Sequence, residues 1–194
     1  MTNYSHTHTD TTETAHVTSD GVTYTSSGVN VRTRRHTAAG NRQWSQMSFG
    51  TPNIPVGSTI DAVDLQLYCG STPNHPNPEL TITIDMQTAP PALSSSNDPT
   101  DRTTESTGVA WSATVSTDVY TSTPSLVSDM QEWIDGANYA DTDLLVIMTK
   151  TVSGGNARYT YHDGTVSGKE PTISIDYTAP GGRRIVTPNV IHSG

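Results

Sequence analysis

Positive charge is scarce in this sequence. Among 194 residues, Lys and Arg together number 10 against 19 Asp and Glu, which gives a net charge of −9, and the lysines are Lys150 and Lys169 alone. Proteins that bind nucleic acid neutralise phosphates with clustered Lys and Arg, so we expect no nucleic-acid partner. An Asp-rich, Lys-poor composition keeps a protein soluble through negative charge, which predicts a source in a saline environment.

Cysteine, aromatic residues and long apolar runs are also scarce. The single cysteine, Cys69, forms no internal disulfide, and its position after Leu67 and Tyr68 predicts a buried small side chain rather than a catalytic thiol. No apolar run reaches the roughly 18 residues of a spanning helix, so membrane insertion is not expected. The N-terminus has neither a basic region nor an apolar core, and no signal peptide is predicted. Hydrophobic residues at 32% and aromatic residues at 6% suit a thin sandwich with a polar exterior.

Short segments with β periodicity fill most of the chain. Residues 60–68, 80–86 and 172–177 alternate between apolar and polar side chains, which is the period of a half-buried strand. Residues 144–148 form a continuous apolar run that is typical of a strand buried on both faces. These patterns predict an all-β fold in which two antiparallel sheets pack as a β-sandwich over residues 17–178.

One short helix is predicted at about 124–135. Thr123 is suited to the N-cap, Pro124 to the first helical position, and Gly136 to a left-handed residue that ends the helix. Trp133 has two interpretations, a platform for a sugar and a core anchor, and its place on the apolar stripe favours the core. That stripe has the spacing of one helix face: Leu126, Val127, Met130, Trp133 and Ile134.

Two segments outside the sandwich are predicted to be arms. Residues 1–16 are nearly all polar and predict a flexible N-terminal arm. Residues 179–194 follow the last predicted strand and form a C-terminal arm. This arm either adds a strand to the sheet edge of a neighbouring subunit or packs back on its own domain. The residues that would bind the partner are basic or apolar: Arg183, Arg184, Ile185, Val186, Val190 and Ile191.

Two groups of side chains have ligand atoms suited to a divalent metal. They are His6, His8 and Asp10 in the N-terminal arm, and Asp98 and Asp101 in the polar stretch 89–108. The first group would share one face of a strand, and the second, with Glu105, would offer carboxylate oxygens to calcium in a spacing that does not match an EF-hand. The alternative is a solvated arm and a solvated acidic loop. No cofactor is expected beyond such a structural calcium or other divalent metal.

The clearest ligand cluster in the sequence is an aromatic strand. Arg158, Tyr159, Tyr161 and His162 precede a turn, and sugars bind to aromatic faces flanked by polar side chains. Trp44 belongs to the same hypothesis if it points outward, and it is a core anchor if it points inward. The alternative for the tyrosines is that one packs inward while the other lies on a solvated face. No carboxylate has an identifiable acid–base partner, so we expect no enzyme.

Three segments, in this order, resemble the DNRLRE-type jelly-roll domains, which are similar to some carbohydrate-binding modules. Residues 54–68 resemble "I-P-x-G-x-x-I-x-x-A-x-L-x-L-Y", except that Val63 stands where the family has a small residue, which Ala62 supplies one position earlier. Residues 125–136 resemble "V-T-x-x-V-x-x-W-x-x-G", and residues 171–177 resemble "P-x-L-x-V-x-Y". The resemblance implies a jelly-roll sandwich of two antiparallel sheets, as found in polysaccharide-processing proteins, adhesins and phage structural proteins.

The resemblance and the two arms together predict a non-enzymatic virion structural protein. It would be a capsid decoration or a turret or tail surface subunit, a homo-oligomer that binds major capsid or tail proteins through its arms. The alternative is a carbohydrate-binding module or adhesin, extracellular or at a cell surface, that recognises a polysaccharide such as a host-surface glycan. Fold alone does not decide between the two, because one fold hosts many functions.

Overall fold

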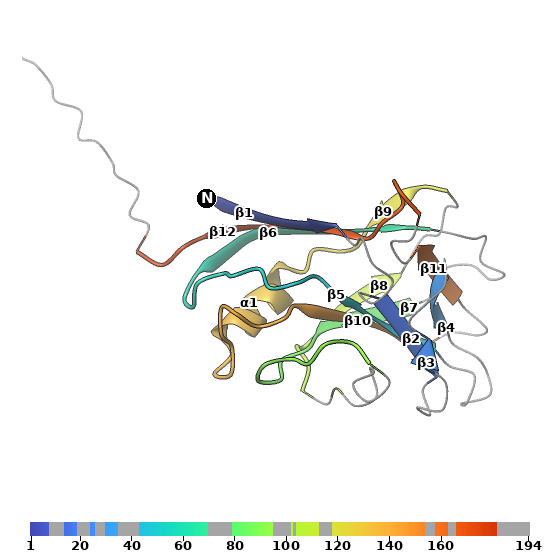
Figure 1. Cartoon of the computed structure of the whole chain (residues 1–194), viewed down its shortest axis with the longest axis horizontal. Coiled ribbons are helices and arrows are strands. Elements are labelled where there is room, and N and C mark those ends of the chain that lie inside the picture. The colour runs from blue at the N-terminus through green and yellow to red at the C-terminus, as the bar shows by residue number, and fades with distance from the viewer. Residues whose placement is uncertain are drawn as a thin grey trace, which may run out of the picture.

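Two antiparallel β-sheets face each other in the computed structural model of the chain (Figure 1). The structure describes residues 1–7, 14–18, 24–25, 30–34, 43–69, 79–94, 102, 104–112, 118–153, 158–162 and 166–181. Within these ranges one short helix accompanies the strands. No helix in this part of the chain is both long and apolar enough to cross a membrane.

The smaller sheet has four strands. In spatial order they are β1 (Thr2–Thr7), β12 (Thr172–Thr178), β6 (Thr59–Tyr68) and β9 (Tyr120–Ser122). The larger sheet has eight. Its main path is β11 (Arg158–His162), β4 (Asn30–Arg34), β5 (Gln43–Ser48), β10 (Val146–Ser153), β7 (Glu79–Ile84) and β8 (Val109–Ser112). Beside this path, β2 (Thr14–Thr18) pairs with β5 and with β3 (Tyr24–Thr25).

The strand order is that of a jelly roll. Eight strands form the basic sandwich: β1, β5, β6, β7, β8, β9, β10 and β12. Numbered one to eight along the chain, they are ordered 1-8-3-6 in the smaller sheet and 2-7-4-5 in the larger one. This interleaving, in which the first strand lies beside the last, is how the two Greek keys of a jelly roll wind together. The predicted fold class is therefore confirmed.

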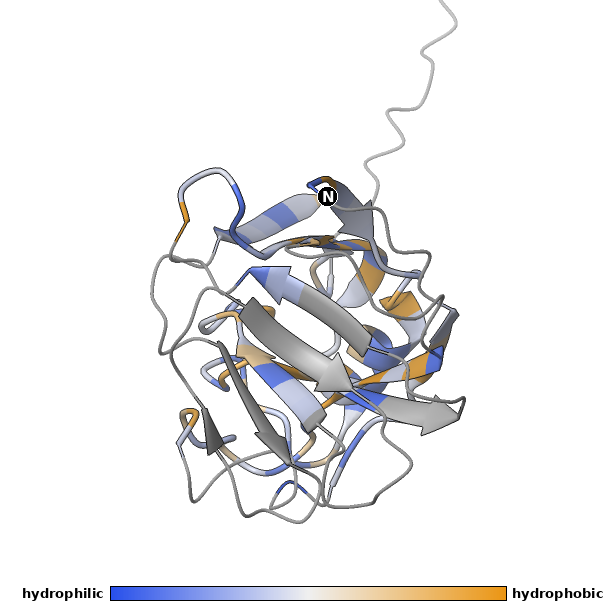
Figure 2. Cartoon of the chain, turned by 90° about the vertical axis from the view of Figure 1, so that its right-hand side faces the viewer, coloured by the Kyte–Doolittle hydropathy of each residue, from blue (hydrophilic) through white to orange (hydrophobic). Residues whose placement is uncertain are grey.

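Side-chain alternation places the core between the sheets. In the smaller sheet, Leu65 and Ile173 are register partners and both are buried. In the larger sheet, Ile147 lies between its partners Met47 and Ile84, and all three are fully buried. Each such side chain contributes about 1.5–3 kcal/mol when it leaves water. Figure 2 colours the described residues by hydropathy, with hydrophobic positions in orange among the blue and white polar ones.

The helix α1 (Val127–Asp135) packs between the sheets at one end of the sandwich. Trp133 is buried in the core as predicted, and its ring meets Tyr139 in a T-shaped contact with the centroids 4.7 Å apart. The predicted N-cap was wrong, because the N-cap is Leu126, three residues later, and its side chain makes no capping hydrogen bond. Thr123 instead donates its backbone N–H to the Leu65 carbonyl and so belongs to the sheet. Gly136 does end the helix, but in an extended rather than a left-handed conformation.

The predicted flexible arm over residues 1–16 is wrong for the residues that the structure describes. Thr2–Thr7 form β1, which pairs along its whole length with β12 and so lies at one edge of the smaller sheet. The inward Tyr4 donates its hydroxyl to the Phe49 carbonyl, and the inward His6 lies against the Phe49 ring. Backbone pairing, one side-chain hydrogen bond and one ring contact thus order a segment whose polar composition alone predicts disorder.

The strand β12 is the last element that the structure describes. This strand ends at Thr178, and the described residues end at Gly181. All six residues of the predicted partner-binding arm, from Arg183 to Ile191, lie outside the described ranges. Their role therefore stays a prediction.

Candidate functional site

The outer face of the eight-stranded sheet is covered at its centre and open at its β7–β8 edge, where Ala110 is exposed. Outward positions at its centre are buried: Gln46 on β5 and Met148 on β10 are fully buried, and Thr83 on β7 is 6% exposed. The chain between β7 and β8 runs beneath this face in Figure 1 and supplies the cover. The long polar stretch 89–108 belongs to this connection. Its described residues therefore serve the fold by closing one face of the sandwich.

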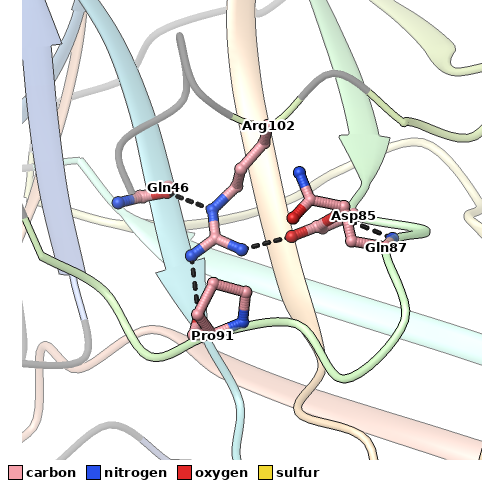
Figure 3. Close-up of polar contacts among 5 residues, drawn as sticks. All are labelled: Gln46, Asp85, Gln87, Pro91 and Arg102. Carbon is pink, nitrogen blue, oxygen red and sulfur yellow. Dashed lines mark hydrogen bonds and ion pairs between the residues drawn. The ribbon is translucent and has the colours of Figure 1, made fainter. Parts of the chain in front are cut away.

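Arg102 anchors the covering connection to the sheet (Figure 3). Its side chain is 2% exposed, and its Nε donates to Gln46 Oε1 at 2.9 Å while Nη2 donates to the Pro91 carbonyl at 2.8 Å. Nη1 forms an ion pair with Asp85, which is fully buried and also accepts the backbone N–H of Gln87 at 3.0 Å. A buried charge is tolerated when it is paired and hydrogen-bonded, and here both conditions hold.

Trp44 lies beside this covered face rather than on an open platform. The Lys150 ammonium is 4.8 Å from the centroid of the Trp44 ring. Lys150 also forms an ion pair with Glu105, which accepts the Thr83 hydroxyl at 2.8 Å. The cation therefore occupies one face of the indole. Trp44 points outward, as the glycan-binding interpretation requires. The ring face that Lys150 covers is not available to a sugar.

The outer face of the four-stranded sheet is open and polar. Asn3, Asp61 and Asp64 are exposed, and Gln66 and Asp176 are partly exposed. Hydrogen bonds hold these side chains in pairs. Asn3 donates to Asp176 at 2.7 Å, and Gln66 donates to Asp64 at 2.7 Å along β6. In Figure 1 no labelled element lies over this face. It is thus a flat, ordered surface of amide and carboxylate groups.

Two tyrosines stand at one end of this open face. Tyr68, at the end of β6, is the register partner of Tyr120 on the edge strand β9. Their rings meet in a T-shaped contact with the centroids 5.2 Å apart, and Tyr120 is 40% exposed. Cross-strand aromatic pairs of this kind stabilise a sheet and hold each ring in place. We call these two side chains the tyrosine pair.

Polar groups surround the tyrosine pair. The Lys169 ammonium is 4.8 Å from the centroid of the Tyr68 ring and 3.9 Å from an Asp118 carboxylate oxygen. Gly168 has a φ of +79°, which glycine adopts without strain, in the turn that carries Lys169. The Tyr120 hydroxyl donates to the Glu170 carbonyl at 3.2 Å. Burial, followed by the charges of Glu170 and Tyr68, raises the pKa of Tyr120, so its hydroxyl remains a donor at neutral pH.

The structure divides the predicted aromatic cluster on β11. His162 is 6% exposed and lies under the tyrosine pair, its ring centroid 5.4 Å from that of Tyr68. Tyr161 is fully buried in the core, so its proposed role as a glycan platform is wrong. The reason is that Tyr161 takes the inward position where β11 meets Cys69 at the end of β6. Arg158 and Tyr159 are placed by backbone register only, opposite Arg34 and Thr33.

Sequence reasoning missed the tyrosine pair itself. Tyr68 ends the predicted strand 60–68, and no signal in the sequence joins it to Tyr120, which is more than 50 residues away. The alternation of Asp64, Gln66 and Tyr68 on one side of β6 does place Tyr68 outward. That pattern could have marked Tyr68 as an outward residue. The exposure of Tyr120 is known only from the structure.

The predicted metal ligands are not brought together in the described part of the chain. His6 packs against Phe49 with the ring centroids 6.0 Å apart. His8, Asp10, Asp98 and Asp101 lie outside the described ranges. Among the residues that the structure does describe, no three His, Cys, Asp or Glu side chains are grouped so that they could hold a metal ion.

Two carboxylates of the helix, one buried and one partly exposed, hold the fold together. Asp129 accepts the Ser106 hydroxyl at 2.6 Å and the Gly108 backbone N–H at 2.7 Å. Glu132 accepts the backbone N–H of Thr107 at 2.8 Å. These bonds tie the end of the covering connection to α1. Each carboxylate is used as an acceptor for backbone or hydroxyl groups, which is a structural role.

A hollow beside the helix is too small for a ligand of ordinary size. It is lined in part by Met86, Gln87, Trp133 and Tyr139 and has a volume of about 80 Å³. Ligand pockets in proteins usually have volumes of roughly 300–1,000 Å³. A second hollow of about 300 Å³ lies at the β7–β8 edge of the larger sheet and is lined by Glu79, Leu80, Thr81, Ala110, Trp111 and Ser112. We choose the tyrosine pair and the polar face beside it as the candidate site because they combine an exposed aromatic ring with several exposed hydrogen-bonding side chains.

Comparison with known proteins gives no relative from which a function can be transferred. No family model matches this chain, and a search of curated proteins finds no significant match. The resemblance to DNRLRE-type domains therefore stays a prediction, and the site has to be interpreted from its own chemistry.

Proposed function

We propose that this jelly roll is a non-enzymatic glycan-binding module whose ligand lies across the outer face of the four-stranded sheet. The observation that carries the proposal is the tyrosine pair at the end of an open polar face, with Tyr120 40% exposed. A tyrosine ring offers an apolar face and a polar edge, which suits the mixed surface of a sugar. The amide and carboxylate groups of Gln66 and Asp64 beside it suit hydroxyl groups.

The shape of the face favours an extended chain over a small ligand. The exposed residues lie on neighbouring strands of a sheet, and the hollows beside the helix and at the β7–β8 edge are lined by residues of other regions. A polysaccharide can contact many such positions at once, so that weak contacts add up. A compact metabolite would need a concave site that buries most of its surface.

The experiment is a binding assay against a panel of soluble polysaccharides, with the variants Tyr68→Ala and Tyr120→Ala. Each variant should lower affinity at least about tenfold, which corresponds to about 1.4 kcal/mol. The matched control is Val56→Ala, because Val56 is 62% exposed in the β5–β6 connection and lies outside the proposed site. Thermal unfolding of each variant separates loss of the site from loss of the fold. Binding that is equal in all four proteins would refute the proposal.

A second candidate function is a structural subunit on the surface of a virus particle. The observation that favours it is that β12 completes the eight jelly-roll strands at Thr178, while the sequence after this strand still contains Ile185, Val186, Val190 and Ile191. Apolar residues that follow the last strand of a sandwich in the sequence suit a contact with a neighbouring subunit. Deleting residues 182–194 should abolish incorporation into particles and leave the unfolding temperature unchanged. Normal incorporation of the truncated chain would remove this candidate. Both functions can coexist in one surface protein.

A further inference from the structure

We infer that the ligand of the tyrosine pair is an uncharged, hydroxyl-rich glycan and not a polyanionic one. This inference rests on the proposed function and adds the chemical class of the ligand. The argument comes from the distribution of charge and of hydrogen-bonding groups over the four-stranded sheet.

The four strands of this sheet contain negative charge and no positive charge. Their sequences include Asp61, Asp64 and Asp176, and none of them contains Lys or Arg. By contrast, Lys150 and Arg158 lie on strands of the other sheet. A uronate or sulfate group placed on the smaller sheet would meet carboxylates with no cation in the same strands. Like charges at such short range disfavour binding, most strongly at low ionic strength.

The polar groups on this face mostly accept hydrogen bonds. Asp64 and Asp176 are carboxylates, and each can accept several hydrogen bonds. The amide nitrogens nearest to them already donate to groups on the face: Gln66 Nε2 donates to Asp64, and Asn3 Nδ2 donates to Asp176 and to Ser174 at 3.1 Å. The amide oxygens of Gln66 and Asn3 add to the acceptors. A ligand that brings hydrogen-bond donors suits this surface, and sugar hydroxyl groups are donors.

The cation beside the face is engaged with the protein. Lys169 lies over the Tyr68 ring and within 3.9 Å of Asp118. It therefore helps to fix the Tyr68 ring and is partly neutralised by Asp118. A site built for an anionic glycan would instead present several Lys or Arg side chains to the ligand.

The test compares two classes of polysaccharide at low and at high salt. The neutral probes are a soluble β-glucan, a galactan and starch, and the anionic probes are alginate and a sulfated galactan. We expect the wild-type protein to bind at least one neutral probe, with an affinity at least about tenfold above that for either anionic probe at low salt. The double variant Asp64→Asn/Asp176→Asn should lower the ratio of neutral-probe affinity to anionic-probe affinity several-fold. The matched control Asp135→Asn/Asp141→Asn removes two exposed charges elsewhere and should leave the ratio unchanged.

The possible results separate this inference from the proposed function. Binding of an anionic probe as tightly as a neutral one, with both lost on Tyr120→Ala, would overturn the inference and leave the proposed function standing. Binding of no probe of either class, or binding that does not depend on Tyr68 and Tyr120, would overturn the proposed function and this inference with it. A ratio that changes equally in the two double variants would also overturn the inference, because net charge would then explain it.

Discussion

Met148 and Gln66 occupy equivalent places in the two sheets. Each lies at an outward position of a central strand, Met148 on β10 and Gln66 on β6, yet Met148 is fully buried and Gln66 is partly exposed. The difference arises because the chain between β7 and β8 covers one sheet and nothing in the described part of the chain covers the other. The two outer faces therefore have different tasks. One is an additional layer of the fold, and the other is a surface on which a ligand can lie.

The largest expected effect comes from placing the same charge at these two positions. Met148→Lys would bury an unpaired ammonium and should destabilise the protein by more than about 4 kcal/mol. Gln66→Lys places the ammonium at the surface and should change stability by no more than about 0.5 kcal/mol. Chemical denaturation of the two variants measures both values. Similar losses for the two would mean that the faces are not covered differently.

The next effect concerns the ion pairs that hold the cover in place. Arg102→Ala should cost about 3–5 kcal/mol, because Asp85 would remain buried without its partner. Lys150→Ala removes a partly exposed ion pair and a cation–π contact and should cost about 1–2 kcal/mol. Urea denaturation of both variants checks the order. A loss below about 1 kcal/mol for Arg102→Ala would contradict the role given to it.

A smaller effect separates a tyrosine at the helix from one at the open face. Burial, with the charges of Asp141 and Asp143, raises the pKa of Tyr139 strongly, whereas that of Tyr120 is raised less. The folded state therefore keeps protons that the unfolded state releases above about pH 10, so stability falls as the pH rises through that region. Tyr139→Phe should reduce this decrease of stability at alkaline pH more than Tyr120→Phe does. The check is the unfolding temperature of each variant measured from about pH 8 to about pH 11, a range that includes the ordinary tyrosine pKa of about 10. An equal effect of the two changes would contradict the assignment.

The smallest effects concern one backbone position near the covered face and one near the open face. Ala89, in the connection that covers the larger sheet, has a φ of +47°, which costs a residue with a Cβ atom about 1 kcal/mol. Ala89→Gly should therefore stabilise the protein by up to about 0.5–1 kcal/mol. Gly168→Ala, beside the open face, should destabilise it by about 1 kcal/mol although no atom blocks the new methyl group. Opposite signs are expected in thermal denaturation, and equal signs would argue against backbone conformation as the cause.

Much of the fold could be predicted from local patterns. The alternation on β6 and β12 and the apolar stripe of α1 describe which side chains face the core, and Leu65, Ile173 and Trp133 lie where these patterns place them. The strand β1 could not be predicted in this way. Its residues are polar, and it is ordered by pairing with β12, which lies at the other end of the sequence.

The candidate site was less predictable than the fold because it depends on register. Tyr68 and Tyr120 become neighbours only when β6 and β9 pair, and a shift of one residue would turn one ring to the other face. Arg102 is a single basic residue in a polar stretch, and its role depends on Gln46 and Asp85, which are remote in the sequence. Tyr161 shows the reverse error. Its sequence context predicts a glycan-binding ring, but its pairing with Cys69 places its side chain inward, where it is fully buried.

The most direct test of the central claim is an NMR titration of the full chain with a neutral oligosaccharide from the binding panel. The account predicts chemical-shift changes at Tyr68, Tyr120, Gln66 and Lys169, with Met148 and Gln46 on the covered face unchanged. Changes confined to the eight-stranded sheet, with the tyrosine pair unaffected, would contradict the claim that the open face of the smaller sheet is the ligand-binding surface.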